Sequence, residues 1–307
     1  MSAAKRLVVC GGNGFLGSRI CKAAVNRGWD VTSIRHACPS SPFLPSTNPP
    51  PSRSGEPQWQ HVTSSSSPPS WAHRVSWERA DIFRPAEYVS LLQGADYVVH
   101  TMGILLEADY KGVLSGRESP LAGLQKAFSA AQGRSANPLA PRREGEELRP
   151  PTPAGTLTYE MMNRDSAILL AKEAERAKVG TFGYVSAAAG APVLPSRYIT
   201  TKREAEQVIA DEFPGMRSVF FRPPMLYDSS RPLTIPLAAM TAAGSLFNGV
   251  TGGVLGGFLG SAGVKPLKVD LVADAVVEGL ADESVRGPVE VPQLEDLASK
   301  LWRKTML

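Results

Sequence analysis

Residues 7–17 read Leu7-Val8-Val9-Cys10-Gly11-Gly12-Asn13-Gly14-Phe15-Leu16-Gly17. Four apolar residues followed by a turn signal are typical of a buried parallel strand. The glycines satisfy two spacings, Gly-x-x-Gly-x-x-Gly from Gly11 and Gly-x-Gly-x-x-Gly from Gly12. Such glycines allow a tight turn, let a pyrophosphate approach bare backbone, and bring the next helix close to the strand. The stretch therefore predicts a dinucleotide-binding loop. Its predicted cofactor contacts are Gly11, Gly12, Asn13, Gly14, Phe15, Leu16 and Gly17.

The residues after this loop continue the same unit. Apolar residues recur at helical spacing up to Gly28, a stop signal for a helix, and residues 31–34 supply a second apolar strand. The predicted helix points its N-terminal N–H groups at the phosphates of a bound dinucleotide. A structural βαβ unit that binds no ligand is the alternative that the sequence leaves open.

Composition excludes several function classes. The chain has 307 residues, with 33 basic and 29 acidic side chains and a formal net charge of +4. This balance, without a basic stripe interleaved with aromatic residues, argues against a nucleic-acid partner. Cys10, Cys21 and Cys38 lack metal-ligand spacing and a disulfide framework, so we expect no metal site and a reducing compartment. The first strand begins a few residues after Met1, where we expect no cleavable presequence.

The choice between NAD and NADP depends on the residue after the second strand. An acidic residue there binds the ribose hydroxyls of NAD, whereas arginine accommodates the 2′-phosphate of NADP. Arg35 stands directly at this position, and Arg53 lies in a similar strand-end motif downstream. Either arginine favours NADPH, with NADH as the alternative, although both also suit a solvated loop. The Pro- and Ser-rich stretch 36–71 predicts a mobile surface loop.

Two further strand ends are expected to line the cofactor crevice. A third strand over 75–77 leads to Asp81 and Ile82, near the adenine, and a fourth strand over 95–100 leads to a second set of cofactor contacts. That set is Thr101, Met102 and Gly103. The polar insertion 107–158 is longer than an ordinary strand-to-helix loop and predicts either a functional flap or disorder.

The later half carries candidate catalytic residues. A helix is predicted over 159–178 with Asn163 near its start, and a fifth strand over 182–186 ends at Ser186. Tyr198 and Lys202 are four residues apart in the next predicted helix, so both face one side.

The glycine loop, Asn163, Ser186 and the Tyr198-x-x-x-Lys202 pair together resemble the short-chain dehydrogenase/reductase superfamily, in its extended or atypical branch. Residues 221–227, Phe-Arg-Pro-Pro-Met-Leu-Tyr, are similar to the Arg-Pro-turn-Tyr element of that branch, which adds Pro223 to the cofactor contacts. The resemblance implies that Tyr198 exchanges a proton with a carbonyl oxygen while the nicotinamide moves a hydride. It also implies that Lys202 lowers the phenol pKa, Ser186 holds the oxygen and Asn163 orders a water relay.

More narrowly, residues 162–167 and 196–206 are similar to fungal mitochondrial proteins of this superfamily that are associated with the coenzyme Q (ubiquinone) biosynthetic complex. They are also similar to the nucleotide-binding accessory subunit of respiratory complex I. This resemblance implies a mitochondrial location, on the matrix side or peripheral to the inner membrane. It also implies a small apolar carbonyl or quinone-like substrate and the coenzyme Q complex as partner.

The expected fold is α/β, a doubly wound parallel-sheet Rossmann fold with a small C-terminal appendage. We expect the NAD(P)-binding domain over 1–228 and a substrate or partner region over 229–307, interleaved with the late strands. Residues 232–264 carry no charge and are rich in glycine. They fit a substrate-domain helix with a loop, a transmembrane helix, or a surface that meets an apolar quinone-like ligand or, over 233–264, the membrane periphery.

The predicted function is that of an NADPH-preferring oxidoreductase in mitochondrial ubiquinone biosynthesis, with hydride transfer at a carbonyl assisted by Tyr198 and Lys202. The competing hypothesis is a non-catalytic, nucleotide-bound scaffold or accessory subunit of a ubiquinone-synthesis or respiratory complex, because a fold and its motif do not guarantee turnover.

Overall fold

A computed structural model describes residues 4–36, 55–63, 65–104, 158–189, 196–230 and 264–306. Several sequence predictions lie outside these ranges. They concern three stretches. The first is 37–54, which includes Arg53; the second is nearly all of the insertion 107–158; the third is nearly all of the membrane or substrate segment 233–264.

The described residues form a seven-stranded parallel sheet in the order β3-β2-β1-β4-β5-β6-β9. Its strands are β1 (Arg6–Cys10), β2 (Asp30–His36), β3 (Val75–Ala80), β4 (Tyr97–His100), β5 (Thr181–Val185), β6 (Arg217–Phe221) and β9 (Gly287–Val289). The order reverses between β1 and β4, and ligands of such sheets bind at the carboxyl ends of the strands beside that reversal. The predicted doubly wound Rossmann fold is confirmed.

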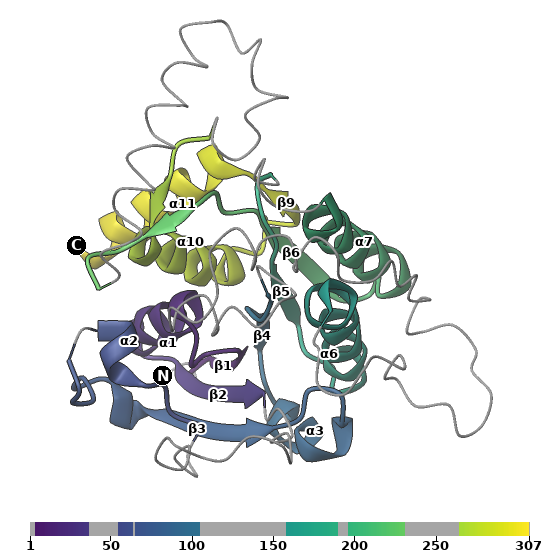
Figure 1. Cartoon of the computed structure of the whole chain (residues 1–307), viewed down its shortest axis with the longest axis horizontal. Helices are drawn as coiled ribbons and strands as arrows, with labels where there is room; N and C mark the ends of the chain where they lie inside the picture. Colours follow the sequence, from purple (N-terminus) through teal and green to yellow (C-terminus); the bar gives the residue numbers. More distant parts are fainter. Residues whose placement is uncertain are drawn as a thin grey trace, which may run out of the picture.

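Helices cover both faces of this sheet (Figure 1). One hydrophobic cluster joins the sheet to α1 (Phe15–Asn26), α10 (Val269–Ala281) and α11 (Val291–Thr305). The other joins it to α3 (Val89–Leu92), α6 (Ser166–Arg176) and α7 (Ser196–Glu212). Leu7 and Val9 of β1 enter the first cluster, whereas Val8 and Cys10 enter the second, because successive side chains of a strand point to opposite faces. This explains the unbroken apolar run in the sequence.

Part of the segment predicted to be a mobile loop is instead packed on the sheet. Within 36–71, α2 (Trp59–Thr63) forms with Trp59 and Val62 buried. The Trp59 ring lies 5.5 Å from that of Trp71 and 5.6 Å from that of Trp77 on β3. The expectation of mobility is therefore wrong for this part, because composition alone did not reveal that the tryptophans share one cluster.

The predicted helices also differ in detail. The helix expected over 159–178 begins as a π-helix, η3 (Glu160–Asp165), and continues as α6. Between β3 and β4, a 3₁₀ turn, η2 (Pro85–Glu87), is followed by the short helix α3. Another 3₁₀ turn, η1 (Ala72–Arg74), precedes β3.

Residues after the predicted boundary at 228 contribute to the main unit. β9 pairs with β6 in the large sheet, and α10 packs against both α1 and α11. A small second sheet pairs β7 (Leu226–Tyr227) with β8 (Leu267–Lys268). None of the helices in the described ranges combines the length and the apolar content that crossing a membrane requires.

Candidate nucleotide and catalytic site

The glycine loop is held by contacts that exclude larger residues. Gly11 has φ +91°, a conformation that favours glycine, and its N–H donates to the carbonyl of Ile34 at 2.8 Å. A Cβ on Gly11 would lie 2.7 Å from Thr101 Oγ1, and one on Gly17 would collide with the Gly11 carbonyl. Gly14 N donates to that same carbonyl at 2.9 Å, and a Cβ on Gly14 would lie only 3.1 Å from its oxygen. Each glycine of the Gly11-Gly14-Gly17 spacing therefore has its own structural reason.

Gly12 has a different role, because a Cβ there would meet the side chain of Ser33 on β2. It lets the loop lie against the core. The loop leads into α1, whose first turn holds no acidic residue that would repel a phosphate. Thr101, directly after β4, binds this strand end to the start of the loop, because its N–H and its Oγ1 both donate to the Cys10 carbonyl, at 2.8 and 2.9 Å. These features fit a dinucleotide pyrophosphate at the start of α1.

The edge of the sheet expected to receive the adenine and its ribose is organised by a residue that the sequence analysis missed. His36 ends β2, and its Nδ1 accepts a hydrogen bond from Ile82 N at 3.3 Å and lies 3.6 Å from Asp81 Oδ1. Arg35, half-buried, is paired in register with Arg79 of β3. The structure thus places Arg35, Asp81 and Ile82 at neighbouring strand ends. In the sequence, the only indication that His36 belongs to this strand end is its position directly after Arg35.

Asn163, Gly103 and Lys202 are brought together although they come from three separate segments. Asn163 lies in the π-helix, is fully buried, and accepts a hydrogen bond from Ile104 N at its Oδ1, at 3.0 Å. A Cβ on Gly103 would lie 2.9 Å from that Oδ1 and 3.6 Å from Lys202 Nζ. Within the described ranges, Asn163 Nδ2 is buried without a hydrogen-bond partner. An unpaired buried donor in such a position suits a ligand atom.

Tyr198 and Lys202 lie on the same side of α7, as their spacing predicts. Lys202 Nζ donates to the Val185 carbonyl at 3.1 Å and lies 5.7 Å from the centre of the Tyr198 ring. Burial lowers the pKa of Lys202 to about 8. Burial raises the pKa of Tyr198 to about 12, and the opposing charge is that of Arg203. The expectation of a lowered phenol pKa is therefore wrong for this structure, because burial outweighs the charge of Arg203.

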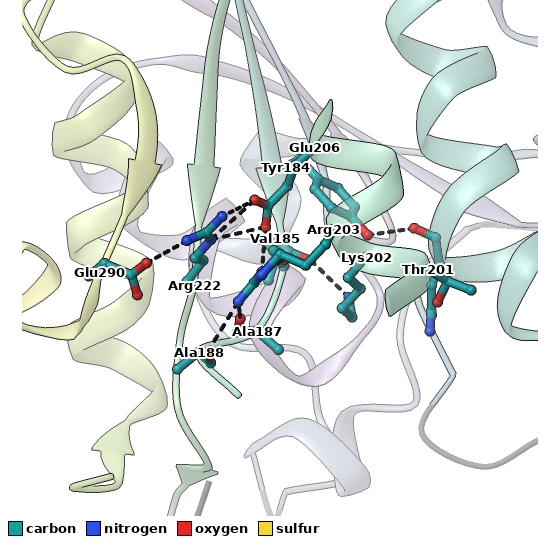
Figure 2. A network of polar contacts seen from close by, with 12 residues as sticks. Tyr184, Val185, Ala187, Ala188, Thr201, Lys202, Arg203, Glu206, Arg222 and Glu290 are labelled. Carbon is teal, nitrogen blue, oxygen red and sulfur yellow. Dashed lines mark hydrogen bonds and ion pairs between the residues drawn. The ribbon is translucent and has the colours of Figure 1, made fainter. Parts of the chain in front are cut away.

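Ser186 contacts a network of polar groups around Arg203, Glu206 and Arg222, and Figure 2 shows these three residues. Arg203 Nη1 donates to Ser186 Oγ at 2.9 Å and to Glu206 Oε1 at 2.6 Å. Its Nη2 donates to the carbonyls of Ala187 and Ala188, at 2.7 and 3.2 Å. The guanidinium thus closes the loop after β5, and Ser186 Oγ accepts from it, which leaves the Ser186 proton to be donated elsewhere.

The same network reaches the end of β6. The nearly buried carboxylate of Glu206 accepts hydrogen bonds from both Arg203 and Arg222, and Arg222 Nη1 also donates to Glu290 Oε1 at 2.5 Å. Pro223 follows Arg222, and its carbonyl accepts from Ala188 N at 2.9 Å. No role was predicted for Arg203 and Glu206 from the sequence. Their separation of three residues, directly after Lys202 in a predicted helix, was the available signal.

Comparison with known proteins identifies the relatives of this chain. Residues 7–109 match the model of the NAD dependent epimerase/dehydratase family. The chain is 37% identical over 239 residues to MIOREX complex component 2 of Saccharomyces cerevisiae, which covers 74% of each protein. It is 36% identical over 99 residues to an uncharacterized chloroplastic protein of Arabidopsis thaliana, over 32% of this chain and 25% of that protein.

Among solved structures, Pal from Bacillus thuringiensis is similar with a TM-score of 0.50 and 13% identity, over 96% of this chain and 82% of that one. Vestitone reductase from alfalfa is similar with a TM-score of 0.49 and 17% identity, over 93% and 76%. At these identities, the structural comparison concerns the fold alone.

Proposed function

Because this chain belongs to the NAD-dependent epimerase/dehydratase family of extended short-chain dehydrogenases/reductases, we propose that it uses a nicotinamide dinucleotide for hydride transfer at a carbonyl carbon. The observation that carries the proposal is that Gly103 lies close to both Asn163 and Lys202, that Lys202 lies beside Tyr198, and that Asn163 Nδ2 is buried without a hydrogen-bond partner among the described residues. A purely structural βαβ unit has no need of this arrangement.

The residues have separable roles in the proposed reaction. When bound, the nicotinamide supplies or accepts the hydride. With a pKa near 12, Tyr198 is protonated at neutral pH and acts as the acid that donates a proton to the substrate oxygen. Ser186 donates its hydroxyl proton to the same oxygen, since Arg203 already occupies its acceptor side. Lys202, with a pKa of about 8, changes charge close to working pH and so couples the site to solvent protons.

NADPH is the preferred cofactor in this proposal. Arg35 is the residue before the end of β2, and its side chain is half-buried at a place where a guanidinium favours a 2′-phosphate. Arg53 is the second candidate for this contact. Calorimetric titration tests the choice, and equal affinities for NADPH and NADH would contradict it.

The biological setting is proposed from the resemblance to fungal mitochondrial proteins. The chain acts in mitochondria, beside ubiquinone biosynthesis, on a small apolar carbonyl or quinone-like substrate. It partners the coenzyme Q biosynthetic complex and contacts the inner membrane through residues 233–264. Mass spectrometry of molecules that copurify with the chain registers nucleotide, quinone and protein partners together, and their absence from mitochondrial preparations would remove this setting.

A second candidate function is a nucleotide-bound subunit without turnover. It is favoured by one observation, the 37% identity to a yeast protein named as a component of a complex. In this case the glycine loop retains its role, whereas Tyr198 becomes dispensable.

One set of variants separates the two functions. Gly17→Ala removes nucleotide binding because its Cβ collides with the Gly11 carbonyl, whereas Gly215→Ala is its control, since nothing lies within 4 Å of a Cβ there. Tyr198→Phe lowers turnover on the order of 10²–10⁴-fold while nucleotide stays bound. Tyr97→Phe, at the opposite end of its strand from the site, is the matched tyrosine control. If Tyr198→Phe restores ubiquinone levels in cells that lack the chain and Gly17→Ala does not, the subunit hypothesis replaces the catalytic one.

A further inference from the structure

We propose that Tyr184 is a positioning residue that holds two members of the site at once, the Asn163 backbone through its hydroxyl and the Lys202 ammonium through its ring face. The inference rests on the proposed function, because it assigns a residue to that same site. Tyr184 lies on β5, directly before Val185, and is fully buried.

The hydroxyl of Tyr184 fixes the turn that carries Asn163. It donates to the Asn163 carbonyl at 2.5 Å. The preceding carbonyl, of Met162, accepts from the Ser166 hydroxyl at 2.8 Å. The Ser166 hydroxyl also contacts His100 Nε2 at 2.9 Å. A π-helix shifts its backbone hydrogen bonds by one residue relative to an α-helix and frequently occurs at functional sites. Two side-chain hydroxyls on consecutive carbonyls therefore hold this irregular turn in place.

The ring of Tyr184 contacts the second residue that it holds in the site, Lys202. Lys202 Nζ lies 5.3 Å from the centre of this ring, while it donates to the carbonyl of the next residue, Val185. Figure 2 shows the Tyr184 ring and Lys202 as neighbours between β5 and α7. An aromatic face attracts a buried ammonium most where water is excluded. Tyr184 and Val185 thus fix the position of Lys202 from β5.

The two contacts set the geometry of the unpartnered amide. Asn163 Oδ1 accepts from Ile104 N, and Asn163 Nδ2 is left for a ligand near Gly103 and Lys202. A turn that relaxed to α-helical hydrogen bonding would rotate Asn163 away from Ile104. Burial keeps the pKa of Tyr184 well above its usual value, so its hydroxyl stays a donor across the working pH range.

Two substitutions separate the two contacts. Tyr184→Phe removes the hydroxyl and keeps the ring, whereas Tyr184→Leu removes both. Tyr88→Phe is the matched control, because Tyr88 is also fully buried and its hydroxyl has no partner among the described residues.

The first measurement is amide hydrogen exchange at Ile104 without substrate, with the melting temperature recorded in parallel. We expect Tyr184→Phe to raise the exchange rate of Ile104 about tenfold while distant core amides keep theirs, because the acceptor Asn163 Oδ1 is displaced. Tyr88→Phe leaves the rate of Ile104 unchanged. Unchanged exchange at Ile104 in Tyr184→Phe would overturn the role of the hydroxyl.

The second measurement is the titration of the Lys202 ammonium by nuclear magnetic resonance. We expect Tyr184→Phe to keep its pKa near 8 and Tyr184→Leu to lower it by about half a unit, because the lost ring face favoured the cation. If Tyr184→Leu does not fold, Tyr184→Ile and Tyr184→Met repeat the test. An unchanged Lys202 titration in folded variants without the ring would overturn the role of the ring.

The third measurement uses NADPH with menadione as a probe quinone. We expect Tyr184→Phe to lower kcat on the order of 10–100-fold, with the KM for NADPH changed less than about twofold, because the residue orients the site without touching the nucleotide. A wild-type chain without turnover would remove the proposed function alone, since the exchange and titration experiments need no substrate. Equal kcat values in Tyr184→Phe and the wild type would overturn the inference.

Discussion

Acid should weaken this protein through one buried histidine. His100 ends β4, is fully buried, and contacts Ser166 Oγ through Nε2 at 2.9 Å, while its Nδ1 has no partner among the described residues. Burial and the charge of Lys202 lower the pKa of His100 from 6.5 to about 3. The folded protein therefore keeps this imidazole neutral well into the acid range.

The sign and size of this change in the free energy of unfolding follow from the linkage between proton binding and folding. Below pH 6.5 the unfolded chain binds a proton at His100 that the folded chain does not, so stability is fully present above pH 6.5 and is lost as pH falls toward 3. The slope is about 1.4 kcal/mol per pH unit in this window. Between pH 7.5 and pH 5.0 the loss due to His100 is about 2 kcal/mol.

Urea unfolding at the two pH values measures this loss. His100→Gln has no imidazole to titrate, so its free energy of unfolding should fall by about 2 kcal/mol less than that of the wild type between pH 7.5 and pH 5.0. Carboxylates titrate in both proteins and cancel in the comparison. Identical slopes in His100→Gln and the wild type would refute the assignment.

Three further substitutions test contacts outside the glycine loop. Arg217→Met should lower the free energy of unfolding by about 3 kcal/mol in urea titration, because the guanidinium donates to four carbonyls at and after the end of α10, whereas exposed Arg74→Met should change it by about 0.5 kcal/mol or less. Arg203→Met should raise hydrogen exchange at the Ala188 amide about tenfold, since the loop after β5 loses its clamp; unchanged exchange would contradict this role. Glu278→Gln should lower the melting temperature by several degrees, because this buried carboxylate joins Arg27, directly after α1, to Lys304 of α11; a change of less than about one degree would exclude the effect.

The strands and the glycine loop could be predicted because their signals are local. Four apolar residues before Gly11 and the alternation of strands with helices predict a parallel sheet. The spacing of Tyr198 and Lys202 is equally local, since four residues make one helical turn. Recognition of Trp59 as a buried residue failed, because its partners Trp71 and Trp77 are neighbours only after β3 joins the sheet.

The sequence by itself determined the parallel α/β fold, the dinucleotide loop and the identity of the paired residues on α7, because each depends on residues within a few positions of one another. Only the tertiary structure decided the environment of those residues. Burial, a property of the whole fold, raises the pKa of Tyr198 and lowers that of Lys202. The clamp of Arg203 on Ser186 and the contact of Tyr184 with Asn163 join segments 17 and 21 residues apart. Such contacts arise when parallel strands bring their carboxyl ends to one edge of the sheet.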